Sequence, residues 1–525
     1  MGRIVRAVAV VVGLVIGASA WAGISDLADT PNAIGEGIAK TLEEQIGAGR
    51  GEAAMPGSSC YVIARDPFRA IRRGRQLFQR KFTVVQGFGP RAGDGVGDVI
   101  DRNPALGAGL ADSCAACHGR PRGSAGVGGE VFTRPDSRDA PHLFGLGLQE
   151  MLADEMTSEL RALRAGAVAA ATAQGRQLRV ALTAKDVPFG ELVAHADGSV
   201  DTSGVEGVDA DLRVKPFFAH GGSHSIRQFV VGAFNDEMGL QAADPDLAAA
   251  AVGQRVVTPS GFVLDGSLDA ISAPPAADPN YDPDGDGVTN EIDAALVDHM
   301  EFYLLNYFKP ATYQRNALTE RGRRVMQSIG CTECHRPALV VEHDRRIADV
   351  ETVFDPVRGH FNRLFATAVP QFREVIDDSG LPPLREPAGG RFVVENFYSD
   401  LKRHDLGPGF WERNFDGSMR YEFVTEPLWG VGSTAPYGHD GRSINLHEAI
   451  LRHGGEAQRA RHLYAAAPAA LQLAVRAFLE SLVIFPPDDT ASNLDPGDPT
   501  APGFPQQGHG SIRLSALFLD PAESE

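Results

Sequence analysis

The sequence is poor in cysteine, in basic residues and in long apolar segments. Five cysteines among 525 residues are too few for a disulfide-stabilised scaffold. The 49 Lys and Arg are outnumbered by 68 Asp and Glu, and the formal net charge is −19. This balance argues against nucleic-acid binding, because phosphate binding needs clustered basic residues. Hydrophobic residues make up 43% and charged residues 22%, a profile typical of globular rather than disordered proteins. The length is sufficient for several domains.

The N-terminus indicates an exported protein. Arg3 and Arg6 precede an uncharged run over residues 7–20 that ends in small residues, and Ala20 and Ala22 are spaced as in an A-x-A cleavage site. This pattern is typical of a secretory signal peptide over residues 1–22. An uncleaved anchor is the alternative, but the run is shorter than the roughly 20 residues of a membrane-spanning helix. We therefore expect a periplasmic protein that has no membrane span once the signal is removed.

Four of the five cysteines lie in two copies of one pattern. Cys-Ala-Ala-Cys-His spans residues 114–118, and Cys-Thr-Glu-Cys-His spans residues 331–335. The C-x-x-C-H pattern attaches c-type haem, since both thiols bond to the vinyl groups and the histidine ligates the iron. A zinc site would need a second Cys or His pair closer in sequence. The sequence therefore predicts two covalently bound haem c groups. Their attachment residues and proximal ligands are Cys114, Cys117, His118, Cys331, Cys334 and His335.

Helical patterns around the motifs predict two cytochrome c-like haem domains. An amphipathic helix over residues 65–81 precedes the first motif, and a shorter one over 319–330 leads into the second. Asn445 can cap a helix that ends at residues 453–455, and a last helix covers 467–482. The expected fold is mainly α, with long insertions and few strands. The predicted units are the signal peptide (1–22), an N-terminal haem domain (23–315), a C-terminal cytochrome c-like domain (316–485) and a Pro/Gly-rich tail (486–525).

Several further segments carry a recognisable pattern. They read R-Q-F-V-V-G-A-F-N-D-E-M-G over 227–239, H-D-L-G-P-G over 404–409, P-L-W-G over 427–430, T-A-P-Y-G-H-D-G-R over 434–442 and H-G-G-E-A over 453–457. Together they resemble the di-haem oxidoreductase family, a relative of the bacterial di-haem cytochrome c peroxidases. The resemblance covers roughly residues 65–485. It implies that electrons enter at the C-terminal haem and pass to a peroxidase-like N-terminal haem.

The resemblance also implies a second iron ligand for the C-terminal haem. In the peroxidases this ligand is a methionine, fourteen residues beyond the histidine of the T-A-P segment. The same count from His439 reaches His453, which implies an iron bound between His335 and His453. Imidazole in place of a thioether lowers the reduction potential. The alternative role of His453 is a cation at a helix C-terminus.

At the N-terminal haem, the resemblance implies that Glu237 is the distal carboxylate, with Gln228 as another distal candidate. A peroxidase needs a carboxylate to move a proton between the two peroxide oxygens. A solvated helix residue is the alternative reading of Glu237. The family's distal histidine falls near Val131, which cannot ligate iron. Substitutes nearby in the sequence are His142, His220 and His224.

Two places in the sequence could hold calcium. The peroxidases bind an inter-domain ion through an Asn and a T-A-P segment, which implies Asp139, Thr434 and Pro436 here. A separate loop over residues 282–293 has carboxylates at positions 1, 3, 5 and 12 and Gly at 6, the spacing of an EF-hand loop. An Asp/Gly-rich turn is the alternative. The candidate ligands in the loop are Asp282, Asp284, Asp286, Val288 and Asp293.

Two residues depart from the family pattern. The peroxidases carry a Trp between the haems, but the equivalent stretch near Asp154 has none. Trp429 is then either an inter-haem relay or a buried core aromatic. Cys60 belongs to neither motif and is expected to be an unpaired thiol, with an intermolecular disulfide as the alternative.

Three functional classes follow from these observations. The first is a periplasmic di-haem oxidoreductase that takes electrons from a small redox protein and reduces peroxide or another small oxidant. The second is a di-haem electron carrier without a substrate. The third is an oxidase that modifies a partner protein through high-valent haem.

Overall fold

The computed structural model describes residues 42–89, 111–119, 130–131, 138–307, 315–354, 364–413 and 417–482. Helices dominate this part of the chain, and none of its strands exceeds eight residues. The mainly α fold class is therefore confirmed. None of the described helices combines the length and the apolar character needed to span a bilayer. The signal peptide (1–22) and the tail (486–525) lie outside the described residues.

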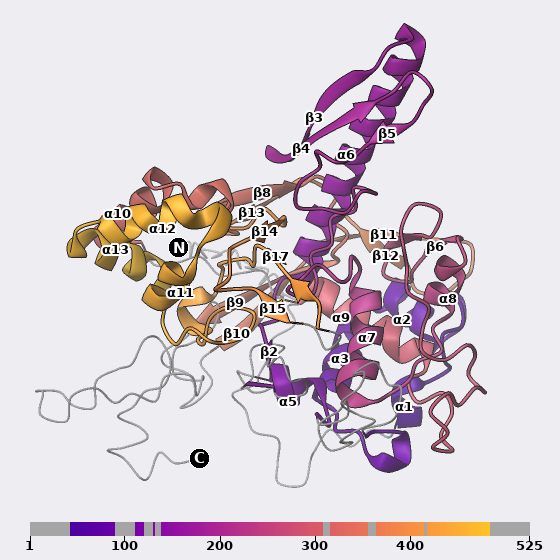
Figure 1. The fold of residues 1–525 in the computed structure, drawn as a ribbon. Coiled ribbons are helices and arrows are strands. Elements are labelled where there is room, and N and C mark those ends of the chain that lie inside the picture. The colour runs from indigo at the N-terminus through magenta and orange to yellow at the C-terminus, as the bar shows by residue number, and fades with distance from the viewer. Residues whose placement is uncertain are drawn as a thin grey trace, which may run out of the picture.

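A first group of helices packs around one buried helix, α9 (Ala294–Asn306). Nearly every residue of α9 is buried, because its sequence is mostly apolar and its charged side chains pair inside the protein. α3 crosses α9 at Gly74, where a Cβ would lie 2.2 Å from the carbonyl oxygen of His299. Only glycine permits this approach. The other helices of this group are α1 (Leu42–Ile46), α2 (Ser59–Arg65), α3 (Pro67–Gln79) and α7 (Ile226–Met238) (Figure 1). The short helix α8 (Pro245–Ala251) is tied to α7 through its N-cap residue Asp244.

A buried ion network holds α7 on α9. The Arg227 guanidinium is completely buried and donates to Asp298 at 2.9 Å and to Glu301 at 2.8 Å, both on α9. It also donates to Asp244 at 2.6 Å. Buried charges are tolerated only when they are paired and hydrogen-bonded. The network therefore fixes the orientation of α7, whose last turn carries Glu237.

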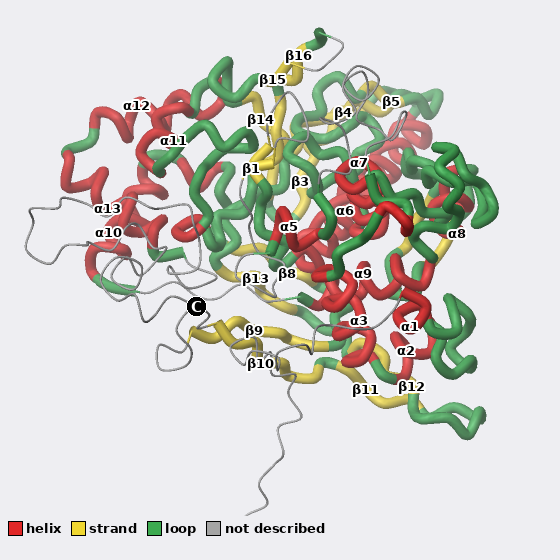
Figure 2. The backbone as a smooth tube through the Cα atoms, turned by 90° about the horizontal axis from the view of Figure 1, so that it is seen from below, coloured by secondary structure: helices red, strands yellow, loops and turns green. Residues whose placement is uncertain are grey.

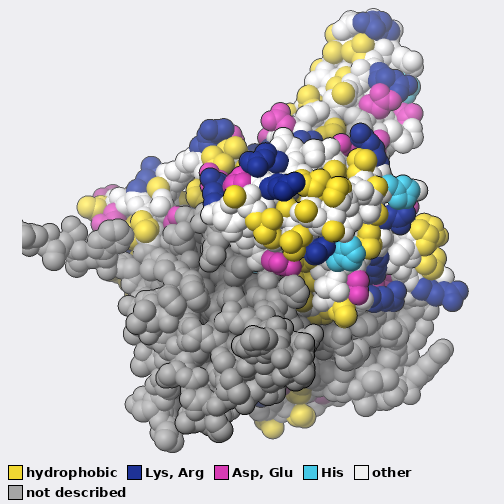
Figure 3. Space-filling model, turned by 90° about the vertical axis from the view of Figure 1, so that its left-hand side faces the viewer, with side chains coloured by type: hydrophobic (Ala, Val, Ile, Leu, Met, Phe, Trp, Pro, Cys, Tyr) yellow, Lys and Arg dark blue, Asp and Glu magenta, His cyan; other side chains and the backbone are white. Residues whose placement is uncertain are grey.

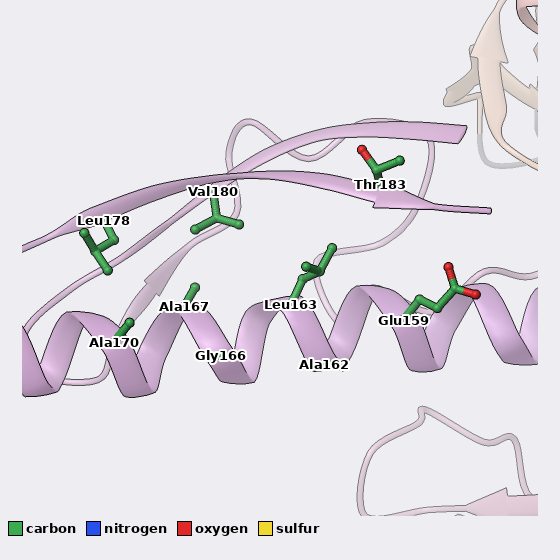
Figure 4. Close-up of a pocket in the computed structure, with 9 residues that line it drawn as sticks. All are labelled: Glu159, Ala162, Leu163, Gly166, Ala167, Ala170, Leu178, Val180 and Thr183. Carbon is green, nitrogen blue, oxygen red and sulfur yellow. The ribbon is translucent and has the colours of Figure 1, made fainter. Parts of the chain in front are cut away.

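A long helix and a small sheet form an arm that projects from the body (Figure 1). The helix α6 (Leu146–Gln174) begins in the core and extends into the arm, where it runs beside an antiparallel sheet. Leu163 and Ala167 on α6 face Leu178 and Val180 on β3 across an open apolar groove (Figure 4). Basic, acidic and apolar side chains are interspersed on the visible face of the arm (Figure 3). The strands of the arm are β3 (Leu178–Ala184), β4 (Val187–Ala194) and β5 (Val200–Asp201).

A second group of helices lies beside the first (Figure 1). It consists of α10 (Ala317–Ser328), α11 (Leu446–Arg452), α12 (Gln458–Ala466) and α13 (Ala469–Glu480). α10 and α13 cross at Gly322, where a Cβ would lie 1.9 Å from the carbonyl oxygen of Ala474. The predicted helices over 319–330 and 467–482 are confirmed within a few residues. Asn445 caps α11 as predicted, because its side chain accepts from the Glu448 backbone N–H at 2.9 Å.

Short antiparallel strand pairs complete the described part of the chain, and some of them, such as β14 with β17, lie between the two groups of helices (Figure 2). The predicted domain boundary near residue 315 falls between α9 and α10, and it stays a prediction. The paired strands are β8 (Ala338–Val341) with β13 (Phe392–Glu395), β9 (Ala348–Phe354) with β10 (Leu364–Pro370), β11 (Phe372–Val375) with β12 (Leu384–Pro387), β14 (Arg403–Asp405) with β17 (Glu422–Val424), β15 (Glu412–Arg413) with β16 (Met419–Arg420), β1 (Glu130–Val131) with β2 (Arg138–Asp139), and β6 (Arg255–Val257) with β7 (Val263–Asp265).

Candidate functional site

The first C-x-x-C-H motif forms a single helical turn, α5 (Cys114–His118). Ser113 caps this turn, since its side chain accepts from the Ala116 backbone N–H at 3.1 Å. His118 Nδ1 donates to the carbonyl oxygen of Pro141 at 2.7 Å. Burial lowers the pKa of His118 although this hydrogen bond opposes it, so the imidazole is neutral near pH 7. With the proton on Nδ1, the lone pair of Nε2 is left for a metal ion.

The second motif has the same arrangement at its histidine. It begins in the short 3-10 helix η3 (Cys331–Glu333), which follows α10 directly. His335 Nδ1 donates to the carbonyl oxygen of Tyr398 at 3.0 Å, and burial lowers the pKa of His335. Metal-binding histidines usually donate their other ring nitrogen to a carbonyl or carboxylate in this way. In both motifs the histidine Nδ1 is therefore held by a main-chain carbonyl, and the lone pair of Nε2 is left for an iron.

His453 lies close to His335. It follows the last residue of α11, and its Nδ1 donates to the carbonyl oxygen of Ala449 at 2.7 Å. Burial lowers the pKa of His453 to about 4, and the nearby His335 adds to this shift. The Phe410 ring packs edge-on against the His453 ring, with the centroids 5.3 Å apart. The two histidines are therefore near enough for the charge of one to affect the other, and their sharing of one iron stays a prediction.

Glu237 lies near the first motif, as the resemblance implies. After burial, its charge is the largest influence that raises the pKa of Cys117, and it also opposes the lowered pKa of His118. Gln228 lies in the first turn of the same helix, about 13 Å from Glu237 along the axis at 1.5 Å per residue. Its side chain accepts from Ser223 Oγ at 3.3 Å. Of the two distal candidates, Glu237 is the one beside the motif.

The three candidate histidines for a sixth ligand have other surroundings. His142 follows Pro141, and its Nε2 donates to the Trp429 carbonyl oxygen at 3.1 Å. His220 stacks on Phe218 with ring centroids 6.2 Å apart. His224 is buried 3.8 Å from the Asp269 carboxylate. These contacts therefore do not identify any of the three histidines as the second iron ligand at the first motif.

A charged cluster around the buried His404, beside the second motif, was not singled out by the sequence reasoning. His404 Nε2 bonds to Asp400 at 2.9 Å and its Nδ1 to Glu456 at 2.7 Å, and Cys334 Sγ lies 4.0 Å from Nδ1. Burial alone would lower the pKa of His404, but these hydrogen bonds outweigh it and raise the pKa to about 12. The cluster links the segment after Tyr398 to the loop after His453. Its only sequence signal is the presence of His404 in the H-D-L-G-P-G segment.

The acidic loop gathers three of its predicted ligands. The carboxylates of Asp282, Asp284 and Asp286 have oxygens within 4.8 Å of one another. Asp282 also accepts from backbone N–H groups of the loop, at 2.7 Å and 2.9 Å. The carboxylate of Asp293 instead caps α9 by accepting from the Ala295 N–H at 2.8 Å. Val288 donates its N–H to Asp286 at 2.7 Å, which leaves its carbonyl oxygen for an ion.

The predicted inter-domain calcium site is described only in part. Thr434 and Pro436 are half-buried in the turn that follows η4 (Val431–Ser433), and the Ala435–Pro436 peptide bond is cis. Asp139 belongs to β2, but its side chain lies outside the described part of the chain.

Cys60 on α2 is half-buried, and burial and Asp298 raise the pKa of its thiol. A thiol in this state is a weak nucleophile.

Residues 378–482 match the family model described as "Di-haem oxidoreductase, putative peroxidase". Over this segment, about a fifth of its length, the chain is similar to that family. The match contains His404, Trp429 and His453, and it confirms the resemblance predicted from the sequence. The family supports haem cofactors and a redox function for the chain. Both C-x-x-C-H motifs precede the matched segment, so the covalent attachment of haem rests on the motifs themselves.

The chain is also similar to a solved structure, the hydrazine synthase of Kuenenia stuttgartiensis pressurised with xenon. The sequences are 11% identical, and the alignment covers 86% of this chain and 99% of the other at a TM-score of 0.33. A TM-score of this size does not define a common fold. None of the curated proteins matches the chain.

Proposed function

We propose that this protein is a periplasmic di-haem c-type oxidoreductase that reduces peroxide or a related small oxidant. Cys331, Cys334 and His335 would hold the haem that accepts electrons from a small redox protein, and the first motif would hold the haem at which the oxidant is reduced. The observation that carries this proposal is the paired arrangement of His118 and His335. Each histidine follows a C-x-x-C pair and donates Nδ1 to a main-chain carbonyl.

The residues fit two covalently bound haems. Each motif offers two thiols and one neutral imidazole whose Nε2 is left for the iron. When bound, each haem supplies an iron that exchanges single electrons. The part of the protein is to hold the ring through its thiols, to orient the imidazole, and to limit access of water. Two cytochrome c-like domains, one for each motif, belong to this proposal.

The C-terminal site is proposed to transfer electrons rather than to bind substrate. His335 and His453 together supply two neutral imidazoles, and both would hold the iron of the C-terminal haem. The position of His453 at the end of α11, with its Nδ1 bonded to Ala449, holds the ring in one orientation. A bis-histidine iron has a lower potential than one with methionine, which suits the donation of electrons to the other site.

The N-terminal site is proposed to carry out the chemistry with Glu237 as the proton-transfer group. Reduction of one peroxide to two waters consumes two electrons and two protons. The Glu237 carboxylate would take a proton from one peroxide oxygen and return it to the other, the leaving oxygen. This role is supported by the influence of the Glu237 charge on the pKa values of Cys117 and His118. The buried pairing of Arg227 with α9 keeps the helix of Glu237 in place.

We also propose a structural calcium ion in the acidic loop, held by Asp282, Asp284 and Asp286 with the Val288 carbonyl oxygen. Converging carboxylate oxygens are the ligands that calcium prefers. The fourth predicted carboxylate, that of Asp293, caps the start of α9 and is not among the proposed ligands. The ion would then order the loop that leads into the central helix.

The test is to prepare the protein together with a cytochrome c maturation system and to measure its intact mass, its electron paramagnetic resonance and its peroxide turnover. We expect a mass increase of two haems and a high-spin ferric component. Glu237→Gln should lower turnover by about 10²–10⁴-fold with both haems retained, and the neighbouring Asp236→Asn should leave turnover near the wild-type level. His453→Met should raise the midpoint potential of one haem.

The same measurements separate the other classes. Two fully low-spin irons without turnover would favour the electron carrier. Rapid bleaching by peroxide without oxidation of a reduced cytochrome would favour an oxidase that modifies a partner protein. A colourless protein of unmodified mass would contradict all three. An unchanged midpoint in His453→Met would remove His453 from the ligand set.

A further inference from the structure

The H-D-L-G-P-G segment over residues 404–409 has no role in the proposed function, although it lies against the loop that begins at His453. The Gly454 N–H in this loop donates to the Leu406 carbonyl oxygen at 2.8 Å. The next residue, Gly455, lies closer still, because a Cβ there would be 2.1 Å from a carbonyl oxygen of the segment. Only glycine permits this approach. The segment and the loop are therefore in direct main-chain contact.

The His404 side chain reinforces this contact. Glu456, three residues after His453, accepts from His404 Nδ1 at 2.7 Å and from the Asp405 N–H at 2.9 Å. On the other side of the ring, His404 Nε2 donates to Asp400 at 2.9 Å. Because both ring nitrogens face carboxylate oxygens, both donate, and the imidazole carries two protons. His404 is therefore held by two charge-assisted hydrogen bonds, which are roughly twice as strong as neutral ones.

Asp400 connects His404 to the second motif. It lies two residues after Tyr398, whose carbonyl oxygen accepts from His335 Nδ1 at 3.0 Å. Only 1% of Asp400 is exposed, and a buried carboxylate is costly unless it is paired, so its bond to His404 is strongly favoured. His404 therefore joins the segment that holds His335 to the loop that carries His453.

Arg452 extends the contact to the residue that precedes His453. Its guanidinium donates to the Gly409 carbonyl oxygen at 2.7 Å and to Asp440 at 2.8 Å. It also lies over the Phe410 ring, 4.3 Å from the centroid, and the same ring packs edge-on against His453. One continuous segment therefore holds the chain on both sides of His453.

Other roles of His404 fit these contacts less well. Cys334, Asp400 and His404 are near enough to hold a metal ion together. The thiol, however, is needed for haem attachment, and neither nitrogen of His404 keeps a lone pair for a metal. A general stabilising role would need no particular neighbours, whereas Asp400 and Glu456 belong to the two segments that carry the predicted iron ligands.

We propose that His404 is a positioning residue that clamps His453 beside His335 and so keeps the C-terminal haem closed to external ligands. This inference rests on the proposed function, since it needs His453 as an iron ligand. An external ligand competes with His453. Its apparent affinity therefore rises with the fraction of molecules in which His453 is released. Loss of the clamp should increase that fraction.

The test measures cyanide binding to the ferric protein with both haems attached, together with its electron paramagnetic resonance. His404→Ala removes the bonds to Asp400 and Glu456. We expect the affinity of the C-terminal haem for cyanide to rise about 10–100-fold, the effect of losing a hydrogen bond between charged groups. Part of the low-spin signal of this haem should be replaced by a high-spin signal.

Two further variants bracket this result. His453→Ala should give the cyanide affinity and the high-spin signal of a fully open site. His299→Ala is the matched control, because His299 is also buried and accepts a hydrogen bond from Arg73 at 3.3 Å, but it lies on α9 in the first group of helices. It should bind cyanide at the C-terminal haem as the wild type does.

Each outcome decides for or against the clamp. If His404→Ala binds cyanide like the wild type and keeps its low-spin signal, the clamp is overturned while the proposed function stands. If His299→Ala gains cyanide binding to the same extent, the effect is general destabilisation, and the clamp is overturned as well. If His404→Ala does not fold, Glu456→Ala decides by the same measurement. If His453→Ala leaves the low-spin signal unchanged, His453 is not a ligand, and that part of the proposed function is overturned together with the clamp.

Discussion

The crossing of α10 and α13 at Gly322 leads to a sharp prediction. In Gly322→Ala, the new Cβ would lie 1.9 Å from the Ala474 carbonyl oxygen and 2.8 Å from Phe478 Cβ. Neither neighbour is a flexible side-chain end, so the helices must separate by about 1.5 Å to restore ordinary contact. Overpacking of this kind costs about 1–3 kcal/mol. The gain of about 0.5–1 kcal/mol from alanine in a helix interior offsets part of it.

We therefore expect Gly322→Ala to lose about 1–2 kcal/mol of stability, which lowers the Tm by roughly 2–8 °C for a unit of this size. The measurement is thermal unfolding of the haem-loaded protein, followed by haem absorbance and by calorimetry. Gly166→Ala on α6 is the matched control, since its Cβ would meet no atom within 4 Å. It should raise the Tm, because only the helix-propensity gain remains. If both variants shift the Tm in the same direction, the tight crossing is wrong.

Three further predictions concern buried charge, pH and calcium. Arg227→Met should destabilise the protein by about 3–5 kcal/mol in urea unfolding, because it leaves carboxylates buried without their partner; a loss under 1 kcal/mol would refute the network. Burial and Arg73 lower the pKa of His299 to about 3, so stability should fall by about 1.4 kcal/mol for each pH unit below 6.5 until the folded pKa is reached. His299→Gln should have a shallower pH dependence than the wild type, and equal slopes would contradict this. Calcium at about 100 times its Kd should stabilise the protein by about 2.7 kcal/mol, a Tm increase that Asp284→Asn should abolish.

Local chemistry explains what could be predicted from the sequence. Haem attachment needs only five consecutive residues, and a helix cap needs only the residues of one turn. The helix over 319–330, the Asn445 cap and the end of α11 at His453 are therefore found where they were expected. The arm was not predicted, because the burial of α6 depends on contacts with α9 and β3 from distant parts of the chain.

In the candidate site, too, some features follow from the local sequence and others only from contacts between distant parts of the chain. His453 and Glu237 were reached by counting along a family pattern, but their nearness to His335 and to Cys117 is a property of the folded chain. Sequence spacing suggested that Asp293 would complete the acidic loop, whereas the structure uses its carboxylate to cap α9. A carboxylate has the same sequence signal in either role, and only the direction of the following helix decides between them.

The sequence by itself determined the two C-x-x-C-H motifs, the mainly α class and the limits of the helices around the second motif, because each depends on residues that are neighbours along the chain. Only the tertiary structure decided which carbonyl groups hold His118 and His335, and that His142 bonds to the Trp429 carbonyl group. These contacts join residues separated by up to 287 positions. They depend on how the helices and hairpins pack around buried side chains, which no local pattern encodes.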